Sequence, residues 1–240
     1  MSNKANLTQN GPMSSTVHTP TPLAQLGPIA QLRAGRLARR LPQLYVGLFL
    51  YGVSLAMMVR GGLGLAPWDV LHSGFIRHVP MTLGQAVILF SFVVLVLWIP
   101  LREMPGLGTI SNAVVVGLSA DVTLAFLGEP DALWARIGLM LGGVVLCGLA
   151  TALYIGAQLG RGPRDGLMTG LSRRTGLSLR LVRTGLEVGV VLIGLLLGGV
   201  LGIGTVVYAL AIGPLTQLML PWFTVDLHAP EPRPTASATS

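Results

Sequence analysis

Charged residues are scarce in this chain. They make up 10% of its 240 residues, whereas hydrophobic residues make up 52% and the mean hydropathy is +0.70. These values lie outside the range of soluble globular proteins, and the apolar residues come in runs of about 20. The composition therefore excludes a soluble domain and indicates an all-α integral membrane protein.

Cysteine is nearly absent as well. The single cysteine, Cys147, lies within an apolar run, which excludes an intramolecular disulfide and a cysteine-based metal site. The sequence also lacks a nucleophile elbow, a phosphate-binding glycine loop and the paired histidines of a zinc-protease helix. We therefore expect no enzymatic activity, no cofactor and no metal.

Six apolar runs are long enough to cross a bilayer as helices. We expect these spanning helices over residues 41–59, 83–101, 107–127, 133–155, 181–201 and 203–220. Residues 1–40 are expected to form a disordered, arginine-rich tail, and residues 222–240 a second disordered tail. Because about 40 polar or mixed residues precede the first run, we expect no cleavable signal peptide.

The membrane part of the chain consists of two similar copies of one sequence, and equivalent residues are 96 positions apart (160 minus 64). Between residues 47–117 and 143–213, about 19 of about 71 aligned pairs are identical, where composition alone gives roughly six. The repeated motif comprises Gly64, Pro67, Asp69 and Gly74, which return as Gly160, Pro163, Asp165 and Gly170. We therefore expect two membrane repeats, residues 41–127 and 132–221.

The two repeats are expected to be inverted. Each holds three spans, an odd number, so the second copy enters the bilayer from the face opposite to the first. Twelve of the 15 arginines fall on the side of the termini, which leaves Arg60, Arg77 and Arg136 on the other side. Because an excess of positive charge marks the cytoplasm, both termini are expected inside. The basic face is expected to attract anionic lipids and not nucleic acid.

The repeated motif predicts a broken helix in each half. Glycines interrupt the helix before Pro67 and Pro163, and each proline fits the first position of a new helix. From Pro67 to Arg77 the new helix is about 16 Å long, which is too short to span. We expect a short or re-entrant half-helix after the first and fourth spans. Thr109 and Thr205, each after a Gly-x-Gly turn, are expected to be helix N-caps.

Two interpretations of Asp69 and Asp165 stay open. Each carboxylate can cap its own half-helix and pair locally, Asp165 with Arg161 or Arg164. Alternatively, both carboxylates line a central cavity and bind a cation, proton or amine, because ionisable residues within membranes often mark pathways.

Other polar residues lie inside the apolar runs. Asn112, Asp121 and Tyr208 are further candidates for binding a solute or ion, and Asn112 and Tyr208 are repeat counterparts. Asp121 is equally well interpreted as an interfacial carboxylate. Glu187 follows Arg183 by four residues, so we expect an ion pair along one helix.

The runs YGVSLAMMVRGGLGLAPWDVLHSG, YIGAQLGRGPRDGLMTGLSRRTG and GIGTVVYALAIGP resemble the YczE/YyaS/YitT family of bacterial integral membrane proteins, most of all its YczE-type branch. The resemblance covers residues 41–220 and rests on the duplicated LGxxPxD motif. It implies a multi-pass protein of the bacterial plasma membrane. It brings no established substrate or catalytic residues.

Two functions fit these observations. Inverted repeats are the plan of many secondary transporters, so the leading hypothesis is a transporter or permease for a small solute, working by alternating access. The alternative is a non-transporting membrane protein that binds lipid or scaffolds a partner through its basic segment, residues 161–183. Faces of small residues are compatible with a homo-oligomer. A polar, water-accessible cavity at mid-depth between the segments of Pro67 and Pro163 would favour transport. A centre packed shut by Leu, Val and Gly, with both aspartates bonded to their own helix ends, would favour the alternative.

Overall fold

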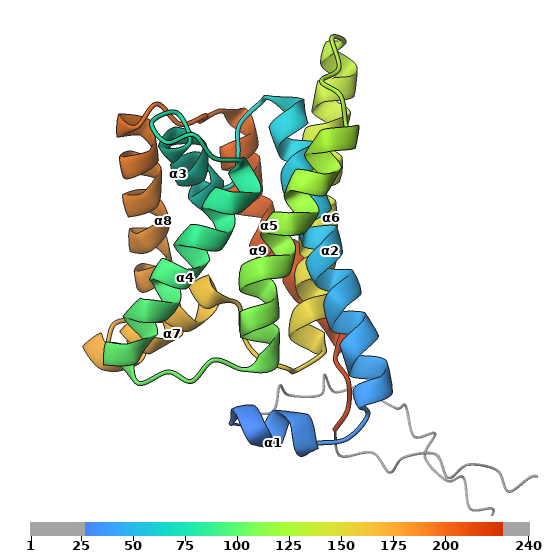
Figure 1. The fold of residues 1–240 in the computed structure, drawn as a ribbon, viewed down its shortest axis with the longest axis vertical. Helices are drawn as coiled ribbons and strands as arrows, with labels where there is room; N and C mark the ends of the chain where they lie inside the picture. Colours follow the sequence, from blue (N-terminus) through green and yellow to red (C-terminus); the bar gives the residue numbers. More distant parts are fainter. Residues whose placement is uncertain (1–26, 228–240) are drawn as a thin grey trace, which may run out of the picture.

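The structure, a computed structural model, describes residues 27–227, which form helices joined by short loops (Figure 1). Within this range there is no strand, in agreement with the expected all-α class. The helices of the described residues are α1 (Pro28–Arg33), α2 (Leu37–Gly61), α3 (Pro67–Phe75), α4 (Leu83–Leu101), α5 (Leu107–Phe126), α6 (Leu133–Gly156), α7 (Pro163–Thr175), α8 (Leu179–Leu196) and α9 (Ile203–Phe223).

Five of the described helices have the length and apolar composition of membrane spans, namely α2, α4, α5, α6 and α9. The sixth expected span forms a helix, α8, but its 18 residues include Arg180, Arg183 and Glu187. Arg183 and Glu187 form the expected ion pair, with 2.8 Å between Nε and Oε1. Five of the six expected spans are thus apolar helices of spanning length, and the sixth region forms a helix that carries charges in its first half.

The two short helices begin at the repeated prolines. α3 starts at Pro67 and α7 at Pro163, positions where the missing proline N–H would have had no partner within the helix. Before each proline the chain turns at a glycine with positive φ, Gly64 at +121° and Gly160 at +134°. With 9 and 13 residues, neither helix is long enough to cross a bilayer.

The first helices of the two repeats, α2 and α6, run antiparallel. Gly47 near the start of α2 lies against Ala150 in the second half of α6, and Gly61 at the end of α2 lies against Arg136 in the first turn of α6. α5 packs on α2, and α9 packs on α6. We name the end of the bundle where α2 ends the distal end, and the end where α2 begins the proximal end. Figure 1 shows α3 towards the distal end and α7 towards the proximal end.

Each half-helix packs on a helix of the other repeat: α3 on α8, and α7 on α4. The loop before each half-helix likewise contacts the other repeat. The Gly204 N–H donates to the Leu63 carbonyl oxygen at 2.8 Å, and the Gly108 N–H donates to that of Leu159 at 2.7 Å. These two hydrogen bonds are counterparts, because 108 plus 96 is 204 and 63 plus 96 is 159. The repeats are therefore interlocked by matching contacts.

The outer surface of the bundle is apolar. Large side chains that are well exposed on the long helices include Phe49, Val96, Phe126, Leu196 and Leu210. The interior is also apolar over most of its volume, with fully buried leucines at positions 44, 48 and 159. An apolar exterior on spanning-length helices is the surface that lipid chains contact.

The predicted disorder over residues 1–40 is wrong for the last part of that segment. Residues 28–33 form α1, and α2 begins at Leu37, four residues earlier than expected. Arg40 is fully buried and anchors this segment. Its guanidinium donates four hydrogen bonds of 2.7 to 3.1 Å to the carbonyl oxygens of Gln31, Gly35, Ala157 and Gln158.

The carboxyl-terminal segment is ordered beyond the last helix. α9 extends to Phe223, and the N–H of the buried Val225 donates to the Gly156 carbonyl at 3.0 Å. The expected tail over residues 222–240 therefore starts later. Residues 1–26 and 228–240, where the sequence also predicts disorder, lie outside the described residues.

Candidate functional site

The first turns of the two half-helices meet between the repeats. The guanidinium carbon of Arg164 lies 5.2 Å from the ring centroid of Trp68, which is a cation–π contact. The two residues are repeat counterparts, since 68 plus 96 is 164. A residue that contacts its own counterpart lies on the axis that relates the two copies. In the inverted arrangement that the sequence predicts, Trp68 and Arg164 would lie on the pseudo-two-fold axis between the repeats.

Asp69 of α3 forms an ion pair with Arg164 of α7 and thereby joins the two half-helices. It is 4% exposed, and its Oδ1 lies 3.0 Å from Nδ1 of His72 and 3.7 Å from Nη2 of Arg164. Within the described residues, the carboxylate accepts no capping hydrogen bond from the backbone of α3. The cap interpretation of Asp69 therefore does not describe its contacts, because the carboxylate is engaged by an imidazole and by an arginine of the other repeat.

Asp165 makes a different contact from its counterpart. The Tyr154 hydroxyl donates to Oδ2 of Asp165 at 2.6 Å. Of the two local partners expected for Asp165, Arg161 donates from Nη1 to Oγ1 of Thr169 at 3.1 Å, and Arg164 pairs with Asp69 while staying within electrostatic range of Asp165. The two aspartates thus differ in their nearest partner, an imidazole for Asp69 and a hydroxyl for Asp165, and Arg164 is within electrostatic range of both.

Asn112 lies in the neighbourhood of Asp165. A Cβ atom placed on Gly162 would lie 2.9 Å from Oδ2 of Asp165, 3.2 Å from the Tyr154 hydroxyl and 3.6 Å from Nδ2 of Asn112. The three polar groups therefore converge on one glycine, immediately before α7. Of the residues singled out in the sequence, Asp165 and Asn112 are brought together here.

Trp68, Asp69, His72, Arg164 and Asp165 are referred to below as the central cluster. Three of its groups have bonding capacity left. The Trp68 Nε1 and the His72 Nε2 are buried and have no hydrogen-bond partner within residues 27–227. In the tautomer whose Nδ1 donates to Asp69, the Nε2 of His72 is an acceptor. The Arg164 guanidinium makes no hydrogen bond to another described residue, and its ion pair with Asp69 is long. Buried polar groups are normally satisfied, so the cluster is suited to a polar ligand.

Tyrosines from the long helices surround the central cluster. Tyr208 is 8% exposed, and its hydroxyl lies 3.6 Å from Sγ of Cys147. The rings of Tyr51 and Tyr154 meet edge to face, with centroids 6.2 Å apart. Arg164 is within electrostatic range of both Tyr51 and Tyr208. Since Tyr51 and Cys147 lie near the middle of α2 and α6, the cluster lies near the mid-length of the two central helices.

Asp121 is not part of the central cluster. Its Oδ2 accepts from the Thr82 hydroxyl at 2.5 Å, and its Oδ1 accepts from the Gly84 N–H at 2.8 Å. Thr82 is the N-cap residue of α4, so the carboxylate from α5 adds a second cap to the same helix start. This contact gives Asp121 a structural role at the distal end.

Thr109 and Thr205 lie at helix starts, but they are not the N-caps that the sequence predicted. Gly106 and Gly202 hold the N-cap positions of α5 and α9. Each threonine lies three residues further on, and its Oγ1 accepts from the N-cap glycine N–H, at 3.1 Å for Thr109 and 3.4 Å for Thr205. Glycine tolerates the extended N-cap conformation, and the side chain that reaches back is the other half of a capping box.

A second pair of counterparts, Arg40 and Arg136, was missed in the sequence. Each guanidinium donates from Nε and Nη2 to two successive carbonyls at the end of the other repeat's first helix. The acceptors are Ala157 (2.8 Å) and Gln158 (2.7 Å) for Arg40, and Gly61 (2.9 Å) and Gly62 (3.1 Å) for Arg136. Unpaired carbonyls and the negative helix end both attract a cation. We name these contacts the proximal and distal arginine clasps; the signal available in the sequence was the offset of 96.

Spanning-length apolar helices, an apolar exterior and charges confined to the centre and the ends define a multi-pass integral membrane protein. Among the described residues, no group of three or more His, Cys, Asp or Glu side chains could hold a metal ion. Residues 38–221 match a family of unknown function, DUF6198, and the chain belongs to this family.

Three curated bacterial proteins are similar to the chain. An uncharacterized protein of Haemophilus influenzae is 42% identical over 177 residues, covering 74% of this chain and 81% of the relative. The uncharacterized membrane protein YczE of Bacillus subtilis is 30% identical over 179 residues, covering 74% and 83%. The uncharacterized protein YyaS of the same species is 26% identical over 183 residues, covering 73% and 90%. The expected relation to YczE and YyaS is confirmed. No solved structure matches the chain.

Proposed function

We propose that the chain crosses the bilayer six times, as two inverted repeats of three spans with a half-helix in each. α8 supports this count, because 18 helical residues extend about 27 Å, close to the thickness of the hydrocarbon core. The antiparallel course of α2 and α6 and the matching contacts at an offset of 96 support the inversion. An odd number of spans per repeat then places the two copies in opposite orientations.

The proximal end is assigned to the cytoplasm. It carries the arginines of α1, of the first turns of α2 and α8, and of the end of α7, whereas the distal end carries Arg60, Arg77 and Arg136. The positive-inside rule supports this orientation. Arg173, Arg174 and Arg180 are exposed there and suit the anionic lipid headgroups of the inner leaflet.

Cysteine labelling tests the orientation in a Cys147→Ser background. Asp131→Cys lies on the distal loop and Leu177→Cys on the proximal loop, and both positions are exposed. A membrane-impermeant maleimide should label the first in intact cells and the second only after permeabilisation. Labelling of both from the same side would rule out the inverted arrangement.

The function we propose is transport of a small polar solute by alternating access between the repeats. The observation that carries this proposal is the contact of Asp69 with Arg164 across the pseudo-two-fold axis, at 3.7 Å and near the mid-length of the central helices. Ionisable groups at membrane depth are costly, so they are retained where they bind solutes or ions. Half-helices whose first turns meet at the centre are also how many transporters build a substrate site.

The scaffold alternative is less well supported by the same contacts. It requires a centre closed by Leu, Val and Gly, with each aspartate bonded to the start of its own helix. Asp69 is bound instead by His72 and Arg164, and Asp165 by Tyr154. Two buried groups without partners, on Trp68 and His72, give the centre free polar capacity that a scaffold would not need.

Proteoliposomes test the transport proposal. Vesicles holding the purified chain are given a defined mixture of radiolabelled amino acids, short carboxylic acids and amines, and uptake is compared with protein-free vesicles. We expect uptake of at least one solute, reduced at least about tenfold by Asp69→Asn or Arg164→Gln because a charged contact is lost. Asp131→Asn, an exposed aspartate outside the cluster, is the matched control. Uptake that persists in both cluster variants would remove the cluster from the solute path, and absence of uptake would favour the scaffold.

A further inference from the structure

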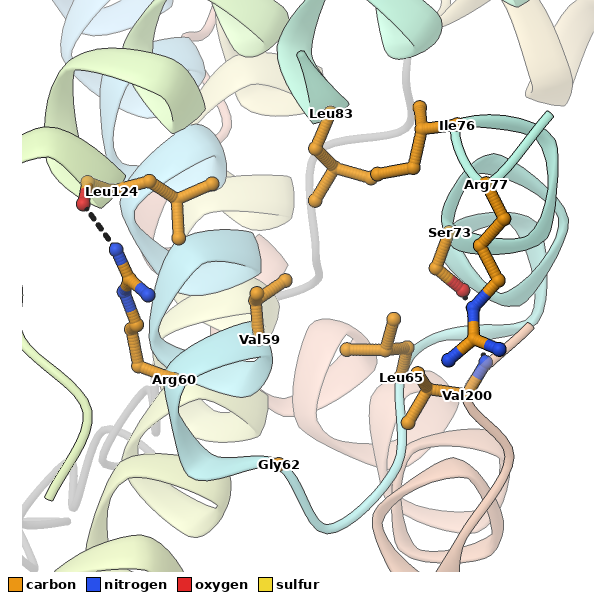
Figure 2. A pocket seen from close by; sticks show the side chains of 10 residues that line it. All are labelled: Val59, Arg60, Gly62, Leu65, Ser73, Ile76, Arg77, Leu83, Leu124 and Val200. Atoms are coloured by element: carbon orange, nitrogen blue, oxygen red, sulfur yellow. Dashed lines mark hydrogen bonds between the residues drawn. The ribbon is translucent and has the colours of Figure 1, made fainter. Parts of the chain in front are cut away.

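A second candidate site lies at the distal end, outside the central cluster. A cavity of about 390 Å³ opens between the last turn of α2, the end of α3, the start of α4 and the end of α5. Figure 2 shows apolar side chains from these elements and from the α8–α9 loop around it. They are Val59, Leu65, Ile76, Leu83, Leu124 and Val200. The volume falls within the range of small-molecule sites, roughly 300–1,000 Å³.

The charged residues that line this cavity are both arginines. Arg60 and Arg77 stand on opposite sides of it, and no acidic residue is part of its lining (Figure 2). Arg60 is held at one rim, because its Nη1 binds Glu129 at 2.8 Å and its Nη2 donates to the Leu124 carbonyl at 2.6 Å. Among the residues that the structure describes, its Nε is buried without a partner. The cavity therefore combines apolar walls with two guanidinium groups, of which that of Arg60 is paired with Glu129.

Arg77 has no structural task that accounts for it. The other two arginines of the distal end are occupied: Arg60 binds Glu129, and Arg136 binds the Gly61 and Gly62 carbonyls. Within the described residues, the guanidinium of Arg77 makes no hydrogen bond or ion pair, and it lies beside Gly198 and the cavity. A cation next to an apolar cavity, with no acid in the lining, is complementary to an anion that carries an apolar body.

We propose that this cavity binds a monovalent organic anion with a hydrocarbon body, its acid group against Arg77 and its chain among the apolar side chains. An inorganic anion would leave the apolar walls unused, and a neutral hydrocarbon would make no use of the exposed Arg77 guanidinium beside them. A single unpaired guanidinium matches a single negative charge. The ligand chemistry has two sources, a free medium-chain carboxylic acid or an anionic lipid of the surrounding leaflet. The site does not depend on the transport proposed above.

Binding of radiolabelled decanoate tests the proposal, with the full chain in nanodiscs of phosphatidylcholine. We expect saturable binding that Arg77→Gln weakens about tenfold, because a charged hydrogen bond is lost. Val200→Trp, at an exposed position on the cavity rim, should abolish binding by filling the space. Arg39→Gln removes an exposed arginine at the proximal end and should leave binding unchanged. Decanol should bind more weakly than decanoate.

Decanoate binding that is the same in the wild type, Arg77→Gln and Val200→Trp would overturn the proposal, provided that all variants keep the wild-type thermal midpoint. No saturable binding to the wild type would overturn it as well. Nanodiscs with added phosphatidylglycerol separate the two sources of ligand. Competition by this lipid identifies a leaflet anion as the occupant, and decanoate binding without competition identifies a free acid.

Discussion

Arg40 and Arg136 make the same pair of hydrogen bonds at opposite ends of the bundle, but they differ in burial. Arg40 is fully buried and has two further bonds, to Gln31 and Gly35, whereas Arg136 is partly exposed and lines a cavity of about 330 Å³. The proximal clasp is thus covered by α1, and the distal clasp is open. The two ends of a symmetric framework are therefore closed to different degrees.

Replacing the clasp arginines should reveal this difference. Arg40→Gln leaves several buried carbonyl groups without a hydrogen-bond donor, and one such group costs roughly 1–3 kcal/mol of folding free energy. We therefore expect a lower thermal midpoint for Arg40→Gln than for Arg136→Gln. The midpoint is measured by intrinsic fluorescence of the purified chain in detergent. Arg39→Gln, at the exposed neighbouring position, is the control and should match the wild type. Equal losses for Arg40→Gln and Arg136→Gln would contradict the idea that burial separates the clasps.

The loops before the two half-helices should not tolerate a side chain at their glycines. A Cβ on Gly64 would lie 2.8 Å from the Gly202 backbone, and a Cβ on Gly160 would lie 3.0 Å from the Thr109 backbone nitrogen. Both glycines also have positive φ. We expect Gly64→Ala and Gly160→Ala each to destabilise the chain by at least about 2 kcal/mol, measured as loss of folded protein on heating.

Gly138→Ala is the matched control for those two variants. Gly138 lies within α6, and a Cβ there would meet nothing within 4 Å. Alanine is a better helix former than glycine, so this variant should be neutral or slightly more stable. A loss at Gly138 as large as at Gly64 would show that alanine at any glycine disturbs the fold.

Asp121 should stabilise the start of α4. Asp121→Ala removes both acceptors, for the Thr82 hydroxyl and the Gly84 N–H, and is expected to cost about 1–2 kcal/mol. Asp121→Asn keeps one acceptor oxygen and should cost less. Solute uptake by Asp121→Asn should be unchanged once the amount of folded protein is corrected for. Loss of uptake without loss of stability would move Asp121 into the solute path.

The contact on the pseudo-two-fold axis can be tested by exchange of its partners. Trp68→Arg alone places two guanidinium groups against each other, and Arg164→Trp alone removes the cation. The double variant restores a cation–π pair in the reverse sense, so its stability should exceed the sum of the single effects by about 1 kcal/mol. A full double-mutant cycle of thermal midpoints measures this coupling. Strict additivity would show that the two side chains do not interact.

Much of the fold was accessible from the sequence. The apolar runs placed the long helices, and the prolines fixed the first residues of α3 and α7, because both signals act within a few turns of chain. The sequence failed where a contact joins distant segments. The offset of 96 identified Trp68 and Arg164 as counterparts, but counterparts touch only on the axis, and the position of the axis depends on how the helices pack.

Polar residues were harder to interpret than apolar ones. Asp121 looked like a candidate ligand because its partners, Thr82 and Gly84, lie on another helix and cannot be read from its neighbours in the chain. For the aspartates of the repeated motif, local rules favoured helix caps, and their depth in the membrane kept a ligand role open. Arg164, the observed partner of Asp69, comes from the other repeat, whereas Tyr154, the partner of Asp165, lies on the preceding helix of the same repeat.

The contact between Trp68 and Arg164 also bears on how such a chain can originate. In a dimer of two identical half-length subunits, a residue on the two-fold axis meets its own copy. Arginine would face arginine there, and tryptophan would face tryptophan. Once the two copies are joined in one polypeptide, the residues on either side of the axis can change independently. Because both copies lie in one chain, the two positions can differ, and a lone cation faces an indole where a homodimer would have two identical side chains.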